Sequence, residues 1–298
     1  MSAIKTLYIP VAEGVQLAAS SFGEQQQPLV ILMHGAGQTR YSWRNAGQHL
    51  AQAGWHAVTV DIRGHGDSDW SEDGDYSIDT LVSDLLTVVG RLSATNDTKP
   101  VLVGASLGGI CGMLAEGEAV SQVFRSMVLV DITPRVDNTG VARIIEFMNR
   151  YQSGFATIEE AATAVARYQS QRRPLTDSDS VGANASRSKS SSGLKKNLRL
   201  ADDGRYYWHW DPRLMHHVGA IDEHFYLRQR DAAQNLKLPV LLIRGQQSDI
   251  VSCESVKEFL QLVPHAQFQD IADAAHMVAG DSNDVFARSV LDFIARSD

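Results

Sequence analysis

Short apolar runs recur along the chain, separated by stretches in which apolar residues follow helical spacing. Most of the central runs are continuously apolar, which is typical of strands in a parallel sheet that is buried on both faces. The strands that this pattern predicts lie near Lys5 to Ile9, Val15 to Ser21, Leu29 to Met33, His56 to Asp61, Val101 to Val103, Met127 to Val130, Val240 to Ile243 and Ala266 to Ile271.

Amphipathic helical patterns fall between the predicted strands. The clearest are formed by Leu81, Leu85, Val88 and Val89 and, near the end of the chain, by Phe286, Val290, Phe293 and Ile294. Alternation of strand and helix predicts a doubly wound α/β fold, in which functional sites lie at the carboxyl ends of the strands.

A long insertion interrupts this alternation after the sixth strand. Roughly a hundred residues separate the sixth strand from Leu236, far more than a strand-to-helix connection needs. We therefore expect a helical cap over residues 135–235, inserted between core segments 1–134 and 236–298. The sequence from Thr157 to Glu160 has the form of a capping box, which predicts the start of a cap helix.

Two stretches of the cap have an unusual composition. Residues 176–193 are polar, small and almost free of large apolar groups, so we expect a flexible Ser-rich loop there. Tyr206, Tyr207, Trp208 and Trp210 concentrate four large aromatic side chains in five positions. This aromatic segment is our prediction for the apolar roof of a substrate pocket.

A candidate nucleophile lies directly after the fifth predicted strand. Residues 104–109 read Gly-Ala-Ser-Leu-Gly-Gly and lead into a helix-compatible stretch. A sharp strand-to-helix turn of this kind lifts the serine hydroxyl out of the sheet. Gly104 and Gly108 supply the small residues that such a turn requires. The sequence therefore predicts that Ser106 is the nucleophile of a serine hydrolase.

A general base and an acid follow in the chain order that such a turn predicts. His276 stands in a loop before the last helix, and Asp249 stands just beyond the strand that ends near Arg244. An imidazole must take the proton of a serine nucleophile, and a carboxylate must orient that imidazole. We assign these roles to His276 and Asp249. Asp131 also ends a strand and is the alternative acid, so this choice stays open.

The apolar run that ends at Met33 continues as His34-Gly35-Ala36-Gly37. A turn of this type supplies one amide of an oxyanion hole, and the residue after the nucleophile supplies the other. We assign these amides to Ala36 and Leu107. His34 is expected to brace the turn without titrating in the reaction.

These motifs together resemble the α/β-hydrolase superfamily. The resemblance rests on the His34-Gly35 turn, residues 61–68, the Ser106 turn, Asp249 and His276, in the family's order and spacing. It implies a mostly parallel eight-stranded sheet flanked by helices, with a helical cap inserted after strand six. The branch that the chain resembles includes bacterial carboxylesterases, perhydrolases, C–C bond hydrolases and epoxide hydrolases. Epoxide hydrolases and haloalkane dehalogenases use an aspartate nucleophile, so Ser106 argues against their chemistry.

The resemblance implies hydrolysis of a small-molecule carboxylic ester of small to medium size without a cofactor. A thioesterase, lactonase, perhydrolase or C–C hydrolase would carry the same catalytic residues, and a slow-turnover ligand receptor would share the fold. We expect substrate contacts from Gly37, Trp43, Trp208, Trp210 and Met277. The segment from Asp61 to Gly66 is a strong family marker, and we expect its role to be structural.

The composition limits the classes of binding partner that we expect for this protein. The net charge of −8 gives no electrostatic reason to expect nucleic acid or an anionic membrane surface. Two cysteines are too few for a disulfide framework, and no apolar run is long enough to span a membrane. We expect a cytoplasmic protein. We expect no metal site, because the cap histidines lack metal-ligand spacing. The oligomeric state is left open.

Overall fold

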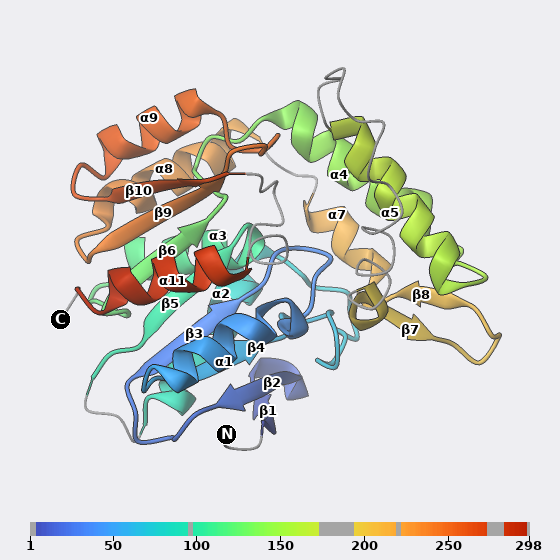
Figure 1. Ribbon diagram of the computed structural model, residues 1–298, viewed down its shortest axis with the longest axis horizontal. Helices are drawn as coiled ribbons and strands as arrows, with labels where there is room; N and C mark the ends of the chain where they lie inside the picture. The colour runs from blue at the N-terminus through green and yellow to red at the C-terminus, as the bar shows by residue number, and fades with distance from the viewer. Residues whose placement is uncertain (1–3, 95–97, 173–193, 219–221, 273–282, 297–298) are drawn as a thin grey trace.

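An eight-stranded sheet forms the centre of the computed structural model (Figure 1), which describes residues 4–94, 98–172, 194–218, 222–272 and 283–296. The strands run in the order β1-β2-β4-β3-β5-β6-β9-β10, and every pair is parallel except β1 with β2 and β2 with β4. Their bounds are β1 Lys5–Pro10, β2 Gln16–Phe22, β3 Leu29–Met33, β4 His56–Val60, β5 Val101–Ala105, β6 Ser126–Val130, β9 Val240–Gly245 and β10 Gln267–Ile271. The predicted α/β-hydrolase fold is confirmed.

The central strands are buried along their whole length because helices cover both faces of the sheet. Every residue of β3, β4, β5 and β6 is buried. Helices α1 (Arg44–Gln52) and α11 (Asn283–Ile294) pack together over one face. The other face is covered by α2 (Ile78–Leu92), α3 (Leu107–Gly117), α8 (Glu223–Asn235) and α9 (Cys253–Leu262).

The elements from α4 to α7, between β6 and α8, build a separate unit beyond one end of the sheet (Figure 1). It contains α4 (Asn138–Arg150), α5 (Ile158–Arg172), β7 (Leu198–Leu200), β8 (Tyr206–Trp208) and α7 (Met215–Val218), with 3-10 turns at Lys195–Asn197 and Pro212–Leu214. Two further 3-10 turns, Ala12–Gly14 and Arg40–Trp43, lie in the core. Because the cap has its own apolar cluster, which includes Phe155, Trp208 and Trp210, it does not depend on the sheet for all of its burial.

Helix α5 starts where the capping box predicts. The backbone N–H of Glu160 donates to Oγ1 of Thr157 at 3.1 Å. The Glu160 carboxylate reaches back and accepts from the N–H of Ala156 at 2.6 Å. Two N–H groups at the helix start therefore find partners in side chains.

The last helix of the predicted cap segment packs with the core. Helix α8 contacts α3 and α9, and Nδ2 of Asn235 donates to the carbonyl of Gly117 at 3.0 Å. The sequence prediction places residues 135–235 in the cap, whereas α8 contributes to a core layer. Hydropathy alone does not separate the two, because α8 presents an apolar side to its neighbours in either position. Residues 176–193, predicted as a flexible loop, lie outside the described residues.

Candidate active site

Ser106 occupies a sharp turn between β5 and α3, as the sequence predicts. Its backbone has φ +46° and ψ −115°, and among the described residues only Asp131 is another non-glycine residue with positive φ. A side chain at Gly104 would come within 2.6 Å of the carbonyl oxygen of Gly108. One at Gly108 would come equally close to the backbone of Met33. The small residues thus allow strand, turn and helix to meet at the serine.

A cavity of about 470 Å³ lies between the sheet's carboxyl edge and the cap, and Ser106 lines it. Most of its walls are apolar side chains of α3, α4 and the cap aromatic cluster. Ala36 and Leu107, the predicted oxyanion donors, line the same cavity. A cavity of this size accommodates a small-molecule ligand.

The His34-Gly35 turn lies directly against the serine. A Cβ built on Gly35 would stand 3.1 Å from Cβ of Ser106. His34 is fully buried, with Nε2 accepting from the N–H of Ile62 at 3.0 Å and Nδ1 donating to the Gly35 carbonyl at 2.8 Å. Burial lowers the pKa of His34 to about 4. A neutral His34 therefore holds the turn in place, in accord with its expected structural role.

His65 supports the same turn from the other side. Its Nε2 accepts from the N–H of Gly37 at 3.2 Å, and its Nδ1 donates to the carbonyl of Arg63 at 3.1 Å. Burial lowers the pKa of His65 to about 3. The rings of His34 and His65 meet edge to face, with centroids 4.9 Å apart. Two neutral histidines thus hold the backbone of the turn that contains Ala36, the predicted oxyanion donor.

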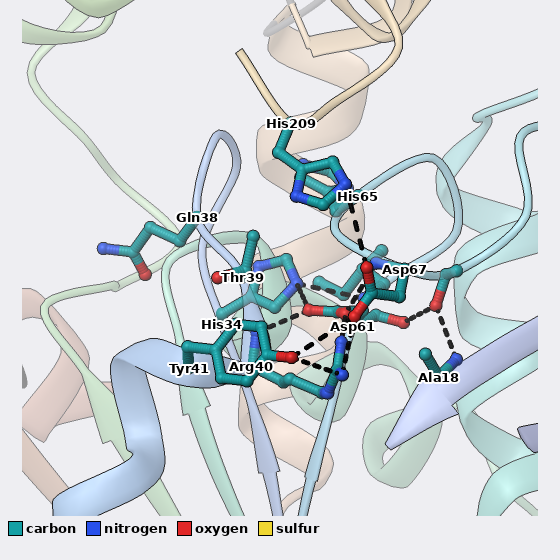
Figure 2. A network of polar contacts seen from close by, with 12 residues as sticks. Ala18, His34, Gln38, Thr39, Arg40, Tyr41, Asp61, His65, Asp67 and His209 are labelled. Atoms are coloured by element: carbon teal, nitrogen blue, oxygen red, sulfur yellow. Dashed lines mark hydrogen bonds and ion pairs between the residues drawn. The ribbon is translucent and has the colours of Figure 1, made fainter. Parts of the chain in front are cut away.

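An ion-pair network anchors this turn to the core (Figure 2). Asp61 is fully buried and accepts from the N–H of Arg40 at 2.5 Å, from the Arg40 guanidinium and from the N–H of Asp67 at 3.0 Å. The guanidinium of Arg63 pairs with the Asp84 carboxylate of α2 through two contacts of 2.8 Å. The segment that begins at Asp61 therefore has the structural role expected for it.

The same segment also binds the cap, a role that the sequence does not reveal. The N–H of Gly66 donates to the carbonyl of His209 at 2.7 Å, and the N–H of Asp211 donates to the carbonyl of Gly64 at 2.8 Å. In addition, the hydroxyl of Tyr76 donates to the Asp211 carboxylate at 2.6 Å. These partners are about 140 positions apart in the chain, so no local sequence motif predicts their contact.

Comparison with known proteins agrees with this architecture. A family model described as "alpha/beta hydrolase fold" matches residues 28–282. The chain belongs to the α/β-hydrolase fold family.

Esterases and other hydrolases are among the relatives of this α/β hydrolase. It is 26% identical to a 3-hydroxybutyrate-oligomer hydrolase of Cupriavidus necator, a match that covers 88% of this chain and 87% of the relative. It is 27% identical to esterase Rv0045c of Mycobacterium tuberculosis over 92% of this chain and 85% of that protein. The crystal structure of E-2-(acetamidomethylene)succinate hydrolase superposes with a TM-score of 0.81 at 19% identity, covering 98% of this chain and all of that one. This last likeness concerns the fold.

Two aspartates of the α/β hydrolase stand at neighbouring strand ends. Asp131 follows β6, is fully buried and has φ +50°. Its carboxylate accepts from the Ser248 hydroxyl at 2.6 Å and from the N–H of Gly245 at 3.3 Å. Asp249 follows β9, and its carboxylate pairs with Nη2 of Arg143 on cap helix α4 at 3.2 Å. Both positions that the sequence offers for the acid are thus present.

The predicted substrate contacts divide into three groups. Gly37, Trp208 and Trp210 line the cavity of this α/β hydrolase. Trp43 does not belong to the cavity wall: it is fully buried in the core under α1 and packs on Phe286, with ring centroids 5.5 Å apart. Its prediction as a substrate contact is corrected, because it ends the 3-10 turn that leads into α1 and its ring is buried among the side chains of α1 and α11. Met277 lies outside the described residues, as does His276.

Helices α4 and α8 contribute cavity residues that the sequence does not reveal. The cavity is also lined by Ile144, Phe147 and Met148 of α4 and by Phe225 and Gln229 of α8. Helical periodicity predicts that such side chains are buried, but not whether they face a cavity or a neighbouring helix. Within the described ranges, no group of three or more histidine, cysteine, aspartate or glutamate side chains is placed to hold a metal ion. No helix described here is long and apolar enough to cross a membrane.

Proposed function

We propose that this protein is a serine hydrolase that cleaves carboxylic esters of small to medium size through an acyl-enzyme. One observation carries the proposal: Ser106 stands in a strained strand-to-helix turn, lines an apolar cavity and lies against the His34-Gly35 turn. A serine held in this way presents its hydroxyl to a bound carbonyl beside two backbone amides.

The proposed reaction has two symmetrical halves. Oγ of Ser106 attacks the ester carbonyl carbon while His276 takes the hydroxyl proton, and the amides of Ala36 and Leu107 stabilise the oxyanion. His276 returns the proton to the leaving alcohol. Water then attacks the acyl-enzyme with His276 again as base, and the carboxylic acid leaves with Ser106 restored. No cofactor takes part in either half.

Asp131 has stronger support than Asp249 as the acid that orients His276. Asp131 follows the strand next to the nucleophile's own, and the N–H of Ser106 donates to the carbonyl of Val130 at 3.1 Å. Its positive φ is costly for a non-glycine residue, and such strain clusters at functional sites. Asp249 has a cationic partner on the cap, which gives it a structural role as well. The proposal therefore takes Asp131 as the acid, with Asp249 as the competing assignment.

The cavity supports a substrate with a mainly apolar buried part. Its volume of about 470 Å³ and its aromatic and aliphatic walls suit a medium-length acyl or alcohol group. The relatives named above include an esterase and a hydrolase of 3-hydroxybutyrate oligomers, and the bond in such oligomers is a carboxylic ester.

Turnover of p-nitrophenyl esters from acetate to long acyl chains tests this function. We expect multiple turnovers with a preference for acyl groups that the cavity can hold. Ser106→Ala should lower kcat at least a hundredfold while leaving the urea unfolding curve of the protein unchanged, because the nucleophile is lost but the turn remains. Retention of more than about a hundredth of the wild-type rate in the folded variant would exclude Ser106 as nucleophile.

A further inference from the structure

Gln229 places a buried polar group in the wall of a mainly apolar cavity. The residue lines the cavity from α8, and only 3% of its surface is exposed. Its Oε1 atom is buried and accepts no hydrogen bond from the described part of the chain. A buried amide oxygen without a partner is unfavourable, so a ligand group that donates a hydrogen bond to it would be favoured in this cavity.

The position of Gln229 follows from how α8 is anchored. The preceding residue, Arg228, pairs on the outside with Asp79 of α2 and with Glu118 beyond α3, both at 2.6 Å. A side chain at Gly117 would collide with the carbonyl of Ala232, so α3 and α8 meet at close range. These contacts prevent α8 from rotating. Gln229 is therefore held toward the cavity and cannot turn its amide to solvent.

A second polar atom in the cavity wall is in the same situation. The indole Nε1 of Trp208 is buried and donates to no acceptor among the described residues. The ring itself is held by stacking on Trp210, with centroids 4.9 Å apart, and by an edge contact with Phe155. The mainly apolar wall thus holds the Gln229 amide oxygen and the Trp208 N–H, and the described residues supply neither with a hydrogen-bond partner.

We infer that Gln229 is a specificity-determining residue and that the substrate carries a hydroxyl group within its buried part, apart from the ester itself. A hydroxyl donates and accepts, so it satisfies the Gln229 amide whichever way that amide is turned. A pure hydrocarbon chain would leave the amide buried without a partner, and such a site discriminates against it. This inference rests on the proposed ester hydrolysis for its substrate class.

Paired substrates and paired variants test the inference. The first substrate series is ethyl hexanoate and its derivatives with a hydroxyl or methoxy group at carbon 3 or carbon 6. The second is hexyl acetate with and without a terminal hydroxyl. Hydrolysis of each substrate is measured as the rate at which acid is released. The variants are Gln229→Leu, which is similar in size and apolar, and Ile145→Met as a control elsewhere on the cavity wall.

We expect the wild type to favour at least one hydroxylated ester over both its unsubstituted and methoxy partners by about tenfold in kcat/KM. Gln229→Leu should abolish that preference and improve kcat/KM for the unsubstituted ester, because the amide no longer has to be buried. Ile145→Met should leave the preference in place. Equal preference in the wild type and Gln229→Leu, or no preference in either, would overturn the inference.

A binding measurement separates this inference from the proposed reaction. Ketone analogues, in which a methylene replaces the ester oxygen, are titrated against both proteins and followed by tryptophan fluorescence. Tighter binding of the hydroxylated ketone to the wild type, reversed in Gln229→Leu, would support the role of Gln229 even if no ester were hydrolysed. Equal binding of both ketones would overturn it even if hydrolysis were rapid.

Discussion

Ser106 and Asp131 are the two non-glycine residues of the described chain whose backbones adopt positive φ, and they follow adjacent strands. Strain of this kind persists only where surrounding contacts enforce it. At Ser106 the enforcing contacts are the close glycine backbones, and at Asp131 they are hydrogen bonds from Ser248 and Gly245. The two strained residues therefore stand at the carboxyl ends of neighbouring strands, and Ser106 lines the cavity.

Separate substitution of Asp131 and Asp249 tests which of the two carboxylates orients the catalytic histidine. We expect Asp131→Asn to lower kcat about a thousandfold or more, because an amide cannot stabilise the imidazolium that forms. Asp249→Asn removes the ion pair with Arg143 and should lower kcat less than tenfold, since surface-facing pairs contribute little. Both are measured on the preferred p-nitrophenyl ester, with unfolding curves as the control. The reverse order of effects would return the role to Asp249.

At the scale of single residues, a role can be predicted from the sequence when it depends on neighbouring positions in the chain. Gly104 and Gly108 were predictable, because a strained turn needs small residues at fixed offsets from the serine. Trp43 was not, since a tryptophan just before a helix packs equally well into a core or a cavity. The acid was ambiguous because Asp131 and Asp249 both follow strands that end at the same edge of the sheet.

At the scale of elements, the loop after β4 joins the His34-Gly35 turn to the cap. His65 holds Gly37 on one side, while Gly64 and Gly66 bond the backbone of Asp211 and His209 on the other. The hydroxyl of Tyr76 also holds Asp211 by donating a hydrogen bond to its carboxylate. Because both connections belong to one short loop, displacement of the cap would be transmitted to the turn that carries Ala36.

Removal of one hydroxyl tests the strength of this connection. Tyr76 is 1% exposed, and its hydroxyl also accepts from the N–H of Ser71 at 3.0 Å. We expect Tyr76→Phe to lower the free energy of unfolding by about 1 to 3 kcal/mol, since Asp211 and the Ser71 amide lose a buried partner. Urea unfolding followed by tryptophan fluorescence measures this. Tyr8→Phe, at an exposed tyrosine of β1, is the matched control and should change it little. Equal stability of the two variants would contradict a connection through Tyr76.

The strands were the most predictable elements, because continuous apolar runs such as Leu29–Met33 have few other stable placements than a sheet covered on both faces. The start of α5 was also predictable from its capping box. The assignment of α8 to a core layer was not, because it depends on the close fit of Gly117 against Ala232, more than a hundred positions away.

At the scale of the whole molecule, buried neutral histidines couple stability to pH. His34 and His65 have pKa values of about 4 and about 3 because burial disfavours their charged forms. In the unfolded chain both would titrate near 6.5. Between these values the unfolded chain binds protons that the folded protein does not, so the stability present above pH 7 falls as the pH is lowered.

Each of the two histidines should cost about 2 kcal/mol of stability between pH 7.5 and pH 5. Urea unfolding at both pH values measures the total. His65→Asn should reduce the pH-dependent loss by about 2 kcal/mol, the share of one buried histidine. Stability that is unchanged from pH 7.5 to pH 5 would mean that these histidines are not held neutral.

The central claim is that Ser106 attacks the substrate and becomes acylated. The most direct measurement is covalent labelling with a fluorophosphonate, which reacts with an activated serine, followed by intact mass and peptide mapping. We expect one label per chain, located at Ser106 and absent from Ser106→Ala. Attachment at another residue, or an unlabelled protein that still hydrolyses esters, would contradict the account.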